Sequence, residues 1–406
     1  MTRLRRPLLG VLVLLSCGGK SGMKPAGSGG SEATGGATGG SPATGGATAT
    51  GGAGTGGAAG GSGGSSTGGV GAVDAAAGGG AGGSAGKATV VLFLIDGLHP
   101  DSARTAAANG ATNLKFVIDN GVVVQTAHST TPAARTVLPD GSLPWGNATS
   151  GNVTVQTGTH LLEAGAAGMD DIFKAARAAG IKSVFSGGDA NYSALTTADF
   201  HYAAVVSDAQ VVEQALTHLR NDKVRLLRLH LQRIRDDWTG PADKTDPGSA
   251  YIKHIVASDA LLGQLRKALE DEGVWDSTLL VVTADHGMGQ TSASAHVAST
   301  ASSWDIFMGF YGPGLKRGAT IPYAELPDVA VTAARFLGLR PLQGHTGATS
   351  LARKGPTGTV LTNLFAGAPD ELAHPRYVEQ YLKMNTFSGS GDDYGAYRSA
   401  MLNLLK

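Results

Sequence analysis

Glycine is concentrated in one stretch of this 406-residue chain, and that concentration limits where a folded core can form. Residues 18–86 contain 30 of the 62 glycines, and Ala, Ser and Thr fill most of the other positions. A segment of this composition, without any aromatic residue, buries too little apolar surface to offset the entropy of ordering it. We therefore expect residues 17–86 to form a flexible tether and residues 87–406 to form the folded domain.

A short apolar segment precedes the tether and has the features of a secretion signal. Three arginines among the first six residues come before the apolar run Leu8–Leu15, which is too short to span a bilayer. Leu14-Leu15-Ser16-Cys17 resembles the lipobox of bacterial lipoproteins, in which the cysteine becomes lipidated. We expect a signal peptide over residues 1–16 and a lipid on Cys17. The chain would then be an outer-membrane lipoprotein of the bacterial cell envelope, facing the periplasm or the surface; an ordinary secretory signal is the alternative.

Charge and cysteine content exclude two classes of protein. Lys and Arg together number 32, as do Asp and Glu, so the formal net charge is zero. A nucleic-acid partner is therefore not expected, because such proteins carry a basic excess. Cys17 is the only cysteine, so the chain forms no internal disulfide and no thiolate zinc cluster.

Apolar runs alternate with helical patterns throughout residues 87–406. The expected strands are 90–95, 122–125, 183–185, 225–231, 279–283 and 306–311, and the expected helices are 170–179, 210–219, 251–269 and 326–337. This alternation predicts an α/β fold with a mostly parallel central sheet and helices on both faces. Ligands of such sheets bind beyond the carboxyl ends of the strands, and Asp96 and the pair Asp285-His286 stand at two such ends.

Two motifs at these strand ends carry a resemblance to a known family. They are Val90-Val91-Leu92-Phe93-Leu94-Ile95-Asp96-Gly97 and Val281-Val282-Thr283-Ala284-Asp285-His286-Gly287. With the turn Gly312–Gly318 and the segment Leu326–Leu339, they resemble the alkaline phosphatase superfamily, in particular its type I phosphodiesterase/nucleotide pyrophosphatase and sulfatase-like branches. The resemblance extends over residues 88–352 and implies an alkaline-phosphatase-like fold.

The resemblance also implies an activity. Members of the family hydrolyse phosphate or sulfate esters with one or two divalent cations that polarise the ester oxygens. We expect a metal-dependent hydrolase of a small-molecule phosphate ester, of phosphodiesterase or phosphatase type, that uses zinc or alternatively manganese or calcium. One cation would be held by Asp96, the nucleophile, Asp285 and His286.

The nucleophile is a hydroxyl residue in the family, placed about ten residues before the glycine of a Thr-Gly pair. It lies at a helix N-terminus, where backbone N–H groups favour the phosphoryl group. Thr149 and Asn152, ahead of Thr157-Gly158, resemble the Thr-x-x-Asn motif of the phosphodiesterase branch. The resemblance makes Thr149 the nucleophile and a metal ligand, and Asn152 a phosphate-binding residue. The spacing from Thr149 to Gly158 is nine, which leaves Ser150 as an alternative.

The second metal site of the family is where this sequence departs from the pattern. The family motif Asp-x-x-x-His-x-x-Gly places Arg233 in the aspartate position and Asp237 in the histidine position. Asp237 or Asp236, with His296 as partner, would form a weak site. Alternatively, Arg233 or Arg235 supplies the positive charge, since a guanidinium binds phosphate oxygens bidentately.

This departure keeps two other functions open. One is a degenerate family member that acts as a tethered binding protein. The other is a sulfatase-like hydrolase, which is disfavoured because the aldehyde-forming sulfatases need a Cys or Ser where Thr130 stands before Pro132. Two further histidines are interpreted as structural: His230 as a hydrogen-bonded core residue inside a strand, and His254 on a solvated helix face.

Overall fold

The computed structural model describes residues 88–130, 147–160, 170–189, 196–289, 301–343, 356–384 and 403–404, with the backbone alone at 147–150, 235–236, 301 and 384. The expected signal peptide and tether lie outside the described residues. Among the helices of these ranges, none combines the length and the hydropathy needed to cross a bilayer.

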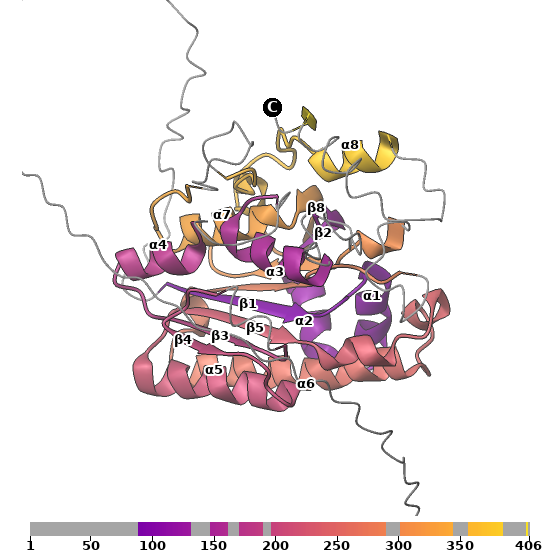
Figure 1. The fold of residues 1–406 in the computed structure, drawn as a ribbon, viewed down its shortest axis with the longest axis horizontal. Helices are drawn as coiled ribbons and strands as arrows, with labels where there is room; N and C mark the ends of the chain where they lie inside the picture. The colour runs from indigo at the N-terminus through magenta and orange to yellow at the C-terminus, as the bar shows by residue number, and fades with distance from the viewer. Residues whose placement is uncertain are drawn as a thin grey trace, which may run out of the picture. The chain divides into compact units, whose positions relative to one another are not determined.

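Eight strands form one sheet in the order β4-β3-β5-β1-β6-β7-β2-β8 (Figure 1). The strands are β1 (Thr89–Ile95), β2 (Val122–His128), β3 (Ser183–Gly187), β4 (Phe200–Tyr202), β5 (Leu226–Leu231), β6 (Thr278–Thr283), β7 (Met308–Tyr311) and β8 (Ala319–Glu325). β7 runs antiparallel to its neighbours β6 and β2, and the other pairings are parallel. The carboxyl ends of β5, β1 and β6 therefore meet at one edge.

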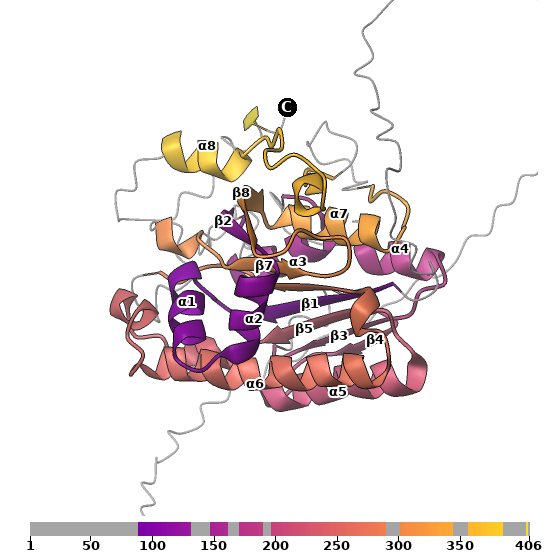
Figure 2. The ribbon, with the colours of Figure 1, turned by 180° about the vertical axis from the view of Figure 1, so that it is seen from behind.

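Helices cover both faces of this sheet (Figures 1 and 2). One layer consists of α1 (Pro100–Ala108), α2 (Thr112–Asn120), α5 (Asp208–Asp222) and α6 (Ala250–Asp271). The other consists of α3 (Asn147–Thr157), α4 (Ile172–Ala178) and α7 (Pro327–Phe336), and α8 (Tyr377–Met384) follows near the C-terminus. Short 3-10 turns are η2 (Arg233–Asp237), η3 (Pro241–Lys244), η4 (Trp275–Ser277), η6 (Ala301–Ser303) and η7 (Thr362–Leu364).

The predicted fold class is confirmed: the sheet is mostly parallel and lies between two helical layers. The sequence patterns did not predict α1, α2, α8 and two strands, β4 and β8. β8 contains Pro322, which normally argues against a strand because proline cannot donate to the ladder. β8 lies at the edge of the sheet, where a missing donor is tolerated.

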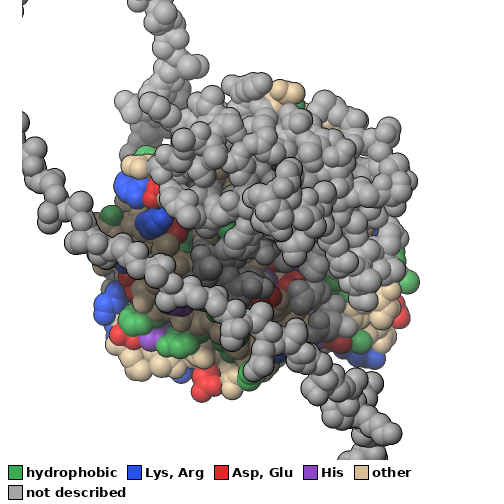
Figure 3. All heavy atoms as spheres, viewed as in Figure 1, with side chains coloured by type: hydrophobic (Ala, Val, Ile, Leu, Met, Phe, Trp, Pro, Cys, Tyr) green, Lys and Arg blue, Asp and Glu red, His purple; other side chains and the backbone are tan. Residues whose placement is uncertain are grey.

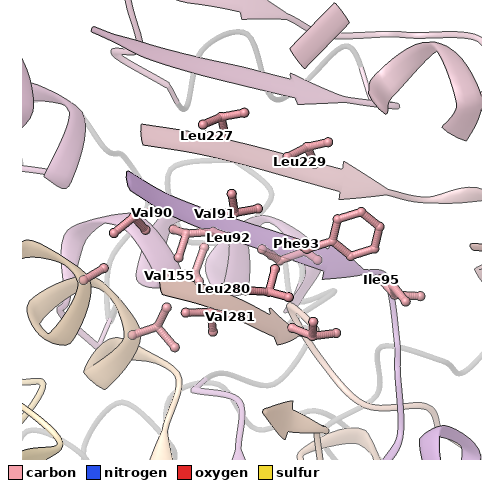
Figure 4. Close-up of a cluster of buried hydrophobic side chains, with 14 of the residues drawn as sticks. Val90, Val91, Leu92, Phe93, Ile95, Val155, Leu227, Leu229, Leu280 and Val281 are labelled. Atoms are coloured by element: carbon pink, nitrogen blue, oxygen red, sulfur yellow. The ribbon is translucent and has the colours of Figure 1, made fainter. Parts of the chain in front are cut away.

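β1 is the centre of the hydrophobic core. Every residue from Val90 to Ile95 is at most 1 % exposed, because β5 and β6 flank the strand and helices cover both of its faces. Figure 4 shows its side chains packed against those of β5 and β6 and against Val155 of α3. On the face in Figure 3, Lys and Arg side chains lie beside Asp and Glu, in line with the balanced charge.

A buried polar network at the end of β8 holds the first turn of α8 against the sheet. Glu325 lies 2.7 Å from His160 Nε2, accepts hydrogen bonds from Tyr323 Oη at 2.7 Å and from the backbone N–H of Val378 at 2.8 Å. Burial raises the pKa of Glu325, but the hydrogen bond and charge of His160, together with the hydrogen bonds from Tyr323 and Val378, outweigh burial and lower that pKa below its ordinary value. The network therefore contains a buried carboxylate with three donors.

We expect Glu325→Ala to destabilise the fold by about 3–5 kcal/mol, because it leaves buried donors without their acceptor. Glu325→Gln, which keeps an acceptor oxygen, should cost less. Urea unfolding would measure both. Asp370→Ala, which removes an exposed partner of Lys316, is the control and should change stability by less than about 1 kcal/mol. A loss for Glu325→Ala as small as that of the control would contradict the role of the network.

Candidate metal centre and active site

Four ionisable side chains converge where β5, β1 and β6 end. Asp96 follows β1, Asp285 and His286 follow β6, and His230 is the penultimate residue of β5, paired in register with Leu94. All four side chains are completely buried. Sheet pairing brings them together from positions as far apart as 96 and 286, as expected for the carboxyl edge of a parallel sheet.

The two imidazoles stand between the two carboxylates. His286 Nε2 lies 3.2 Å from Asp96 Oδ1 and 3.6 Å from Asp285 Oδ2. His230 Nε2 lies 3.7 Å from Asp96 Oδ2 and 3.8 Å from Asp285 Oδ2. Ligand atoms of Asp96, His230 and Asp285 all lie within 4.8 Å of one another. This donor set of carboxylate oxygens and imidazole nitrogens suits a divalent cation.

Hydrogen bonds orient both imidazoles. His286 Nδ1 donates to the carbonyl oxygen of Gly287 at 2.7 Å, and His230 Nδ1 lies 2.7 Å from Asn152 Oδ1. Metal-binding histidines typically donate one ring N–H in this way and present the other nitrogen to the metal. Neither oxygen of Asp96 accepts a hydrogen bond by distance and angle within the described part of the chain, although the side chain is 0 % exposed. The geometry fits a cation between these groups.

The electrostatics of the cluster also favour positive charge there. Burial raises the pKa of Asp285, and the neighbouring Asp96 raises it further. Burial also raises the pKa of Asp96, but the imidazoles of His286 and His230 outweigh burial through charge and hydrogen bonding and hold the pKa of Asp96 well below its ordinary value. Burial lowers the pKa of His286, yet Asp285 and Asp96 outweigh burial and raise it to about 9. Two buried carboxylates thus require a compensating cation, either a proton on imidazole or a metal.

Helix α3 packs directly on this cluster. A Cβ atom added to Gly151 would lie 2.1 Å from the carbonyl oxygen of Asp285, so only glycine permits this approach of the helix. Asn152 Nδ2 donates to Asp285 Oδ2 at 3.1 Å. Thr149 and Ser150 lie in the same first turn of α3, and their side chains are outside the described residues. The first turn of α3 therefore borders the cluster.

A buried arginine supports α3 from the sheet. Arg228 of β5 is 1 % exposed, and its guanidinium donates to Asn152 Oδ1 and to Gln156 Oε1, one turn apart on α3. The guanidinium also lies over the ring of Phe185, 5.0 Å from its centroid. Because guanidinium groups only donate, the Asn152 oxygen must face Arg228 and its Nδ2 must face Asp285.

The segment that corresponds to the second metal site makes other contacts. Arg233 is exposed, and its guanidinium donates to the carbonyl oxygen of Val206 at 3.0 Å. Asp237 Oδ2 lies 2.6 Å from His254 Nδ1, and His254 Nε2 lies 3.3 Å from Asp208 Oδ2. No described contact joins Asp237 to the cluster at Asp96. His254 thus anchors η2 to α6 and to the start of α5.

The structure brings some of the predicted site residues together and places another elsewhere. Asp96, Asp285 and His286 come together, and Asn152 contacts Asp285. Asp237 belongs to the separate contact with His254, and the side chain of Thr149, His296 and Cys17 lie outside the described residues. The sequence interpretation missed His230, although one signal pointed to it. In β5, Arg228 and His230 alternate with leucines, so two polar residues share one face of a strand buried on both faces.

A family model matches the part of the chain that contains His230, Asp285 and His286. Residues 192–305 match the family model of the type I phosphodiesterases/nucleotide pyrophosphatases. The matched segment includes β5, α6 and the pair Asp285-His286, and it confirms the resemblance predicted from the sequence. No curated protein matches the chain.

Several solved structures are similar to the chain at low identity. Murine ectonucleotide pyrophosphatase/phosphodiesterase 5 shares 14 % identity over 64 % of this chain and 97 % of that chain, with a TM-score of 0.47. A phosphonate monoester hydrolase from Silicibacter pomeroyi shares 16 % over 70 % and 78 %, with a TM-score of 0.49. The lipoteichoic acid synthase LtaP from Listeria monocytogenes shares 16 % over 68 % and 75 %, with a TM-score of 0.46. An inactive variant of the murine protein was solved with AMP.

The contact between His254 and its two carboxylates predicts a pH-dependent stability difference. Hydrogen bonding to Asp208 and then to Asp237 raises the pKa of His254, so the charged ring stabilises the fold most below its ordinary pKa of about 6.5. This contribution is lost as pH rises through the folded-state pKa. We expect His254→Gln to cost on the order of 1 kcal/mol at pH 6 and less at pH 9, measured by urea unfolding. An equal cost at both pH values would contradict a charged His254.

Proposed function

We propose that the chain is a metal-dependent hydrolase of phosphate esters, of phosphodiesterase type, with Thr149 as its nucleophile. The observation that carries this proposal is the convergence of Asp96, His230, Asp285 and His286 beside the first turn of α3. The match to the phosphodiesterase family model over residues 192–305 supports phosphate esters as the substrate class.

The donor set supports a particular kind of cation. Imidazole nitrogens and carboxylate oxygens are ligands that zinc and manganese accept, whereas calcium takes oxygen ligands. Asp96, Asp285 and His286 would hold the cation. When bound, a divalent cation supplies Lewis-acid polarisation of the ester and makes a hydroxyl group easier to deprotonate. We therefore propose zinc or manganese as the cofactor.

Residues of α3 would bind the phosphoryl group and supply the nucleophile. The backbone N–H groups at the start of α3 favour the anionic phosphoryl group. The Thr149 oxygen would form a bond to phosphorus while the ester P–O bond breaks, and the departing alcohol takes up a proton. Water would then cleave the phosphothreonine and restore the hydroxyl. Asn152 holds Asp285 through Nδ2, and the proposed contact of Asn152 with a phosphate oxygen would also use Nδ2, because its Oδ1 accepts from Arg228 and an amide oxygen cannot donate.

A second candidate function follows from the segment at η2. Arg233 and Asp237 are engaged by Val206 and His254, so the family's second set of ligands is not reproduced there. This observation favours a tethered binding protein that keeps one cation without turnover. Hydrolysis assays separate the two candidates.

We expect Thr149→Ala to lower the hydrolysis of bis-p-nitrophenyl phosphate by at least about 10³-fold, because the attacking oxygen is lost. Ser150→Ala, the matched control in the same turn, should retain activity. A chelator should abolish the activity, and zinc or manganese should restore it. Full activity in Thr149→Ala would overturn the nucleophile assignment.

The wild-type chain itself distinguishes the candidate functions. If it hydrolyses no phosphate ester with zinc, manganese or calcium, the binding protein becomes the better description. Turnover of a sulfate ester alone would indicate the sulfatase-like alternative.

We also propose that a lipid on Cys17 anchors the chain to the membrane and that residues 17–86 act as its tether. The proposal is supported by the lipobox resemblance around the only cysteine of the chain. Expressed in a bacterium, the full chain should partition into the detergent phase of Triton X-114, and Cys17→Ala should remain in the aqueous phase. Detergent partitioning that survives Cys17→Ala would overturn the lipid anchor.

A further inference from the structure

We infer that His230 is a direct ligand of the cation, so that the chain binds it with four protein side chains, Asp96, His230, Asp285 and His286. This inference rests on the metal dependence proposed above. It differs from the ligand set that the family resemblance implies, which contains the nucleophile but no residue of β5.

The separations between the four side chains carry the inference. Ligands of a tetrahedral zinc ion at about 2.0–2.2 Å lie about 3.4 Å from one another. The four measured separations between imidazole Nε2 and carboxylate oxygen atoms are 3.2, 3.6, 3.7 and 3.8 Å. His230 Nε2 stands at nearly equal distances from Asp96 and Asp285. Ligand atoms of Asp96, His230 and Asp285 already lie within 4.8 Å of one another, and His286 Nε2, at 3.2 Å and 3.6 Å from the two carboxylates, would join them in the loaded site.

The orientation of the His230 ring is determined by its neighbours. Arg228 donates to Asn152 Oδ1, which identifies that atom as the oxygen, and His230 Nδ1 lies 2.7 Å from the same atom. Because an amide oxygen only accepts, Nδ1 must carry the hydrogen. In the neutral ring, Nε2 then bears the lone pair, and Nε2 is the atom that faces the two carboxylates. In metal-binding histidines, such a hydrogen bond on one ring nitrogen orients the ring and presents the other nitrogen to the metal.

His230 Nε2 lies 3.7 Å from Asp96 Oδ2 and 3.8 Å from Asp285 Oδ2. These separations are close to those between two ligands of one cation. Asp96 adds an independent observation, because its two fully buried oxygens face His230 and His286 without an accepted hydrogen bond by distance and angle from the described residues.

The charges of two carboxylates balance those of one divalent cation, so a single cation neutralises the buried cluster. The inference therefore also predicts that one cation per chain fills this site.

The test uses two substitutions of His230, one with a polar group near the Nδ1 position and one with a polar group near the Nε2 position. His230→Asn places an amide near the Nδ1 position, where it still donates to Asn152, but provides nothing at Nε2. His230→Gln reaches the Nε2 position with a weak oxygen ligand. Zn²⁺ affinity of the full chain is measured by chelator competition, and the visible spectrum of bound Co²⁺ reports the ligands. His218→Asn is the matched control, since His218 Nδ1 likewise lies 2.7 Å from a side-chain oxygen, Asp222 Oδ2, on α5.

We expect His230→Asn to weaken Zn²⁺ binding at least 10–100-fold and to change the Co²⁺ spectrum, with a smaller loss for His230→Gln. The control should match the wild-type chain. Unchanged affinity and spectrum in His230→Asn would overturn the inference. If His230→Asn does not fold, X-ray absorption on the Zn²⁺-loaded wild-type chain decides: two imidazoles in the coordination shell support the inference and one overturns it.

These measurements need no substrate and can be repeated in Thr149→Ala. A chain that binds Zn²⁺ through His230 but hydrolyses no ester would contradict the proposed activity and leave the ligand assignment standing. A chain that hydrolyses esters with unchanged metal binding in His230→Asn would contradict only the ligand assignment.

Discussion

Two carboxylates buried together at the ends of β1 and β6 are the constraint on which the surrounding structure depends. Asp96 and Asp285 are both inaccessible to solvent, and each would be costly to ionise there alone. The imidazoles of His230 and His286, the amide of Asn152 and the guanidinium of Arg228 surround them in successive layers. The imidazoles face the carboxylates, Asn152 forms hydrogen bonds with His230 and Asp285, and Arg228 in turn donates to Asn152. The polar core of this domain is therefore built around two buried carboxylates.

The sheet determines which residues can take part in this arrangement. Parallel pairing of β5, β1 and β6 aligns three carboxyl ends, and β5 contributes alternate residues to the α3 side. Arg228 and His230 therefore reach α3, whereas the alternate residues Leu227, Leu229 and Leu231 fill the opposite face of the sheet. The close approach at Gly151 completes the contact, because it brings the first turn of α3 to the end of β6.

Local patterns were sufficient to predict much of the fold and part of the site. Long apolar runs identified β1 and β6, and the residues that follow them, Asp96 and Asp285-His286, could be predicted because strand ends are visible in a sequence. His230 could not be assigned in the same way, since its role depends on register: it acts with Asp96 because β5 pairs with β1 at Leu94. The contact of Asp237 with His254 depends in turn on how η2 packs against α6, and no sequence motif indicates that packing.

The double use of Asn152 has a consequence for how such a centre can change. One amide fixes the tautomer of an imidazole, the direction of a carboxylate and the position of a helix turn. Under the proposed function, a substitution of Asn152 that changed metal binding would therefore also disturb the turn of α3 that contains Thr149. Metal selectivity and nucleophile placement would then be coupled through this amide, and engineering of the proposed centre would have to vary α3 and β5 together.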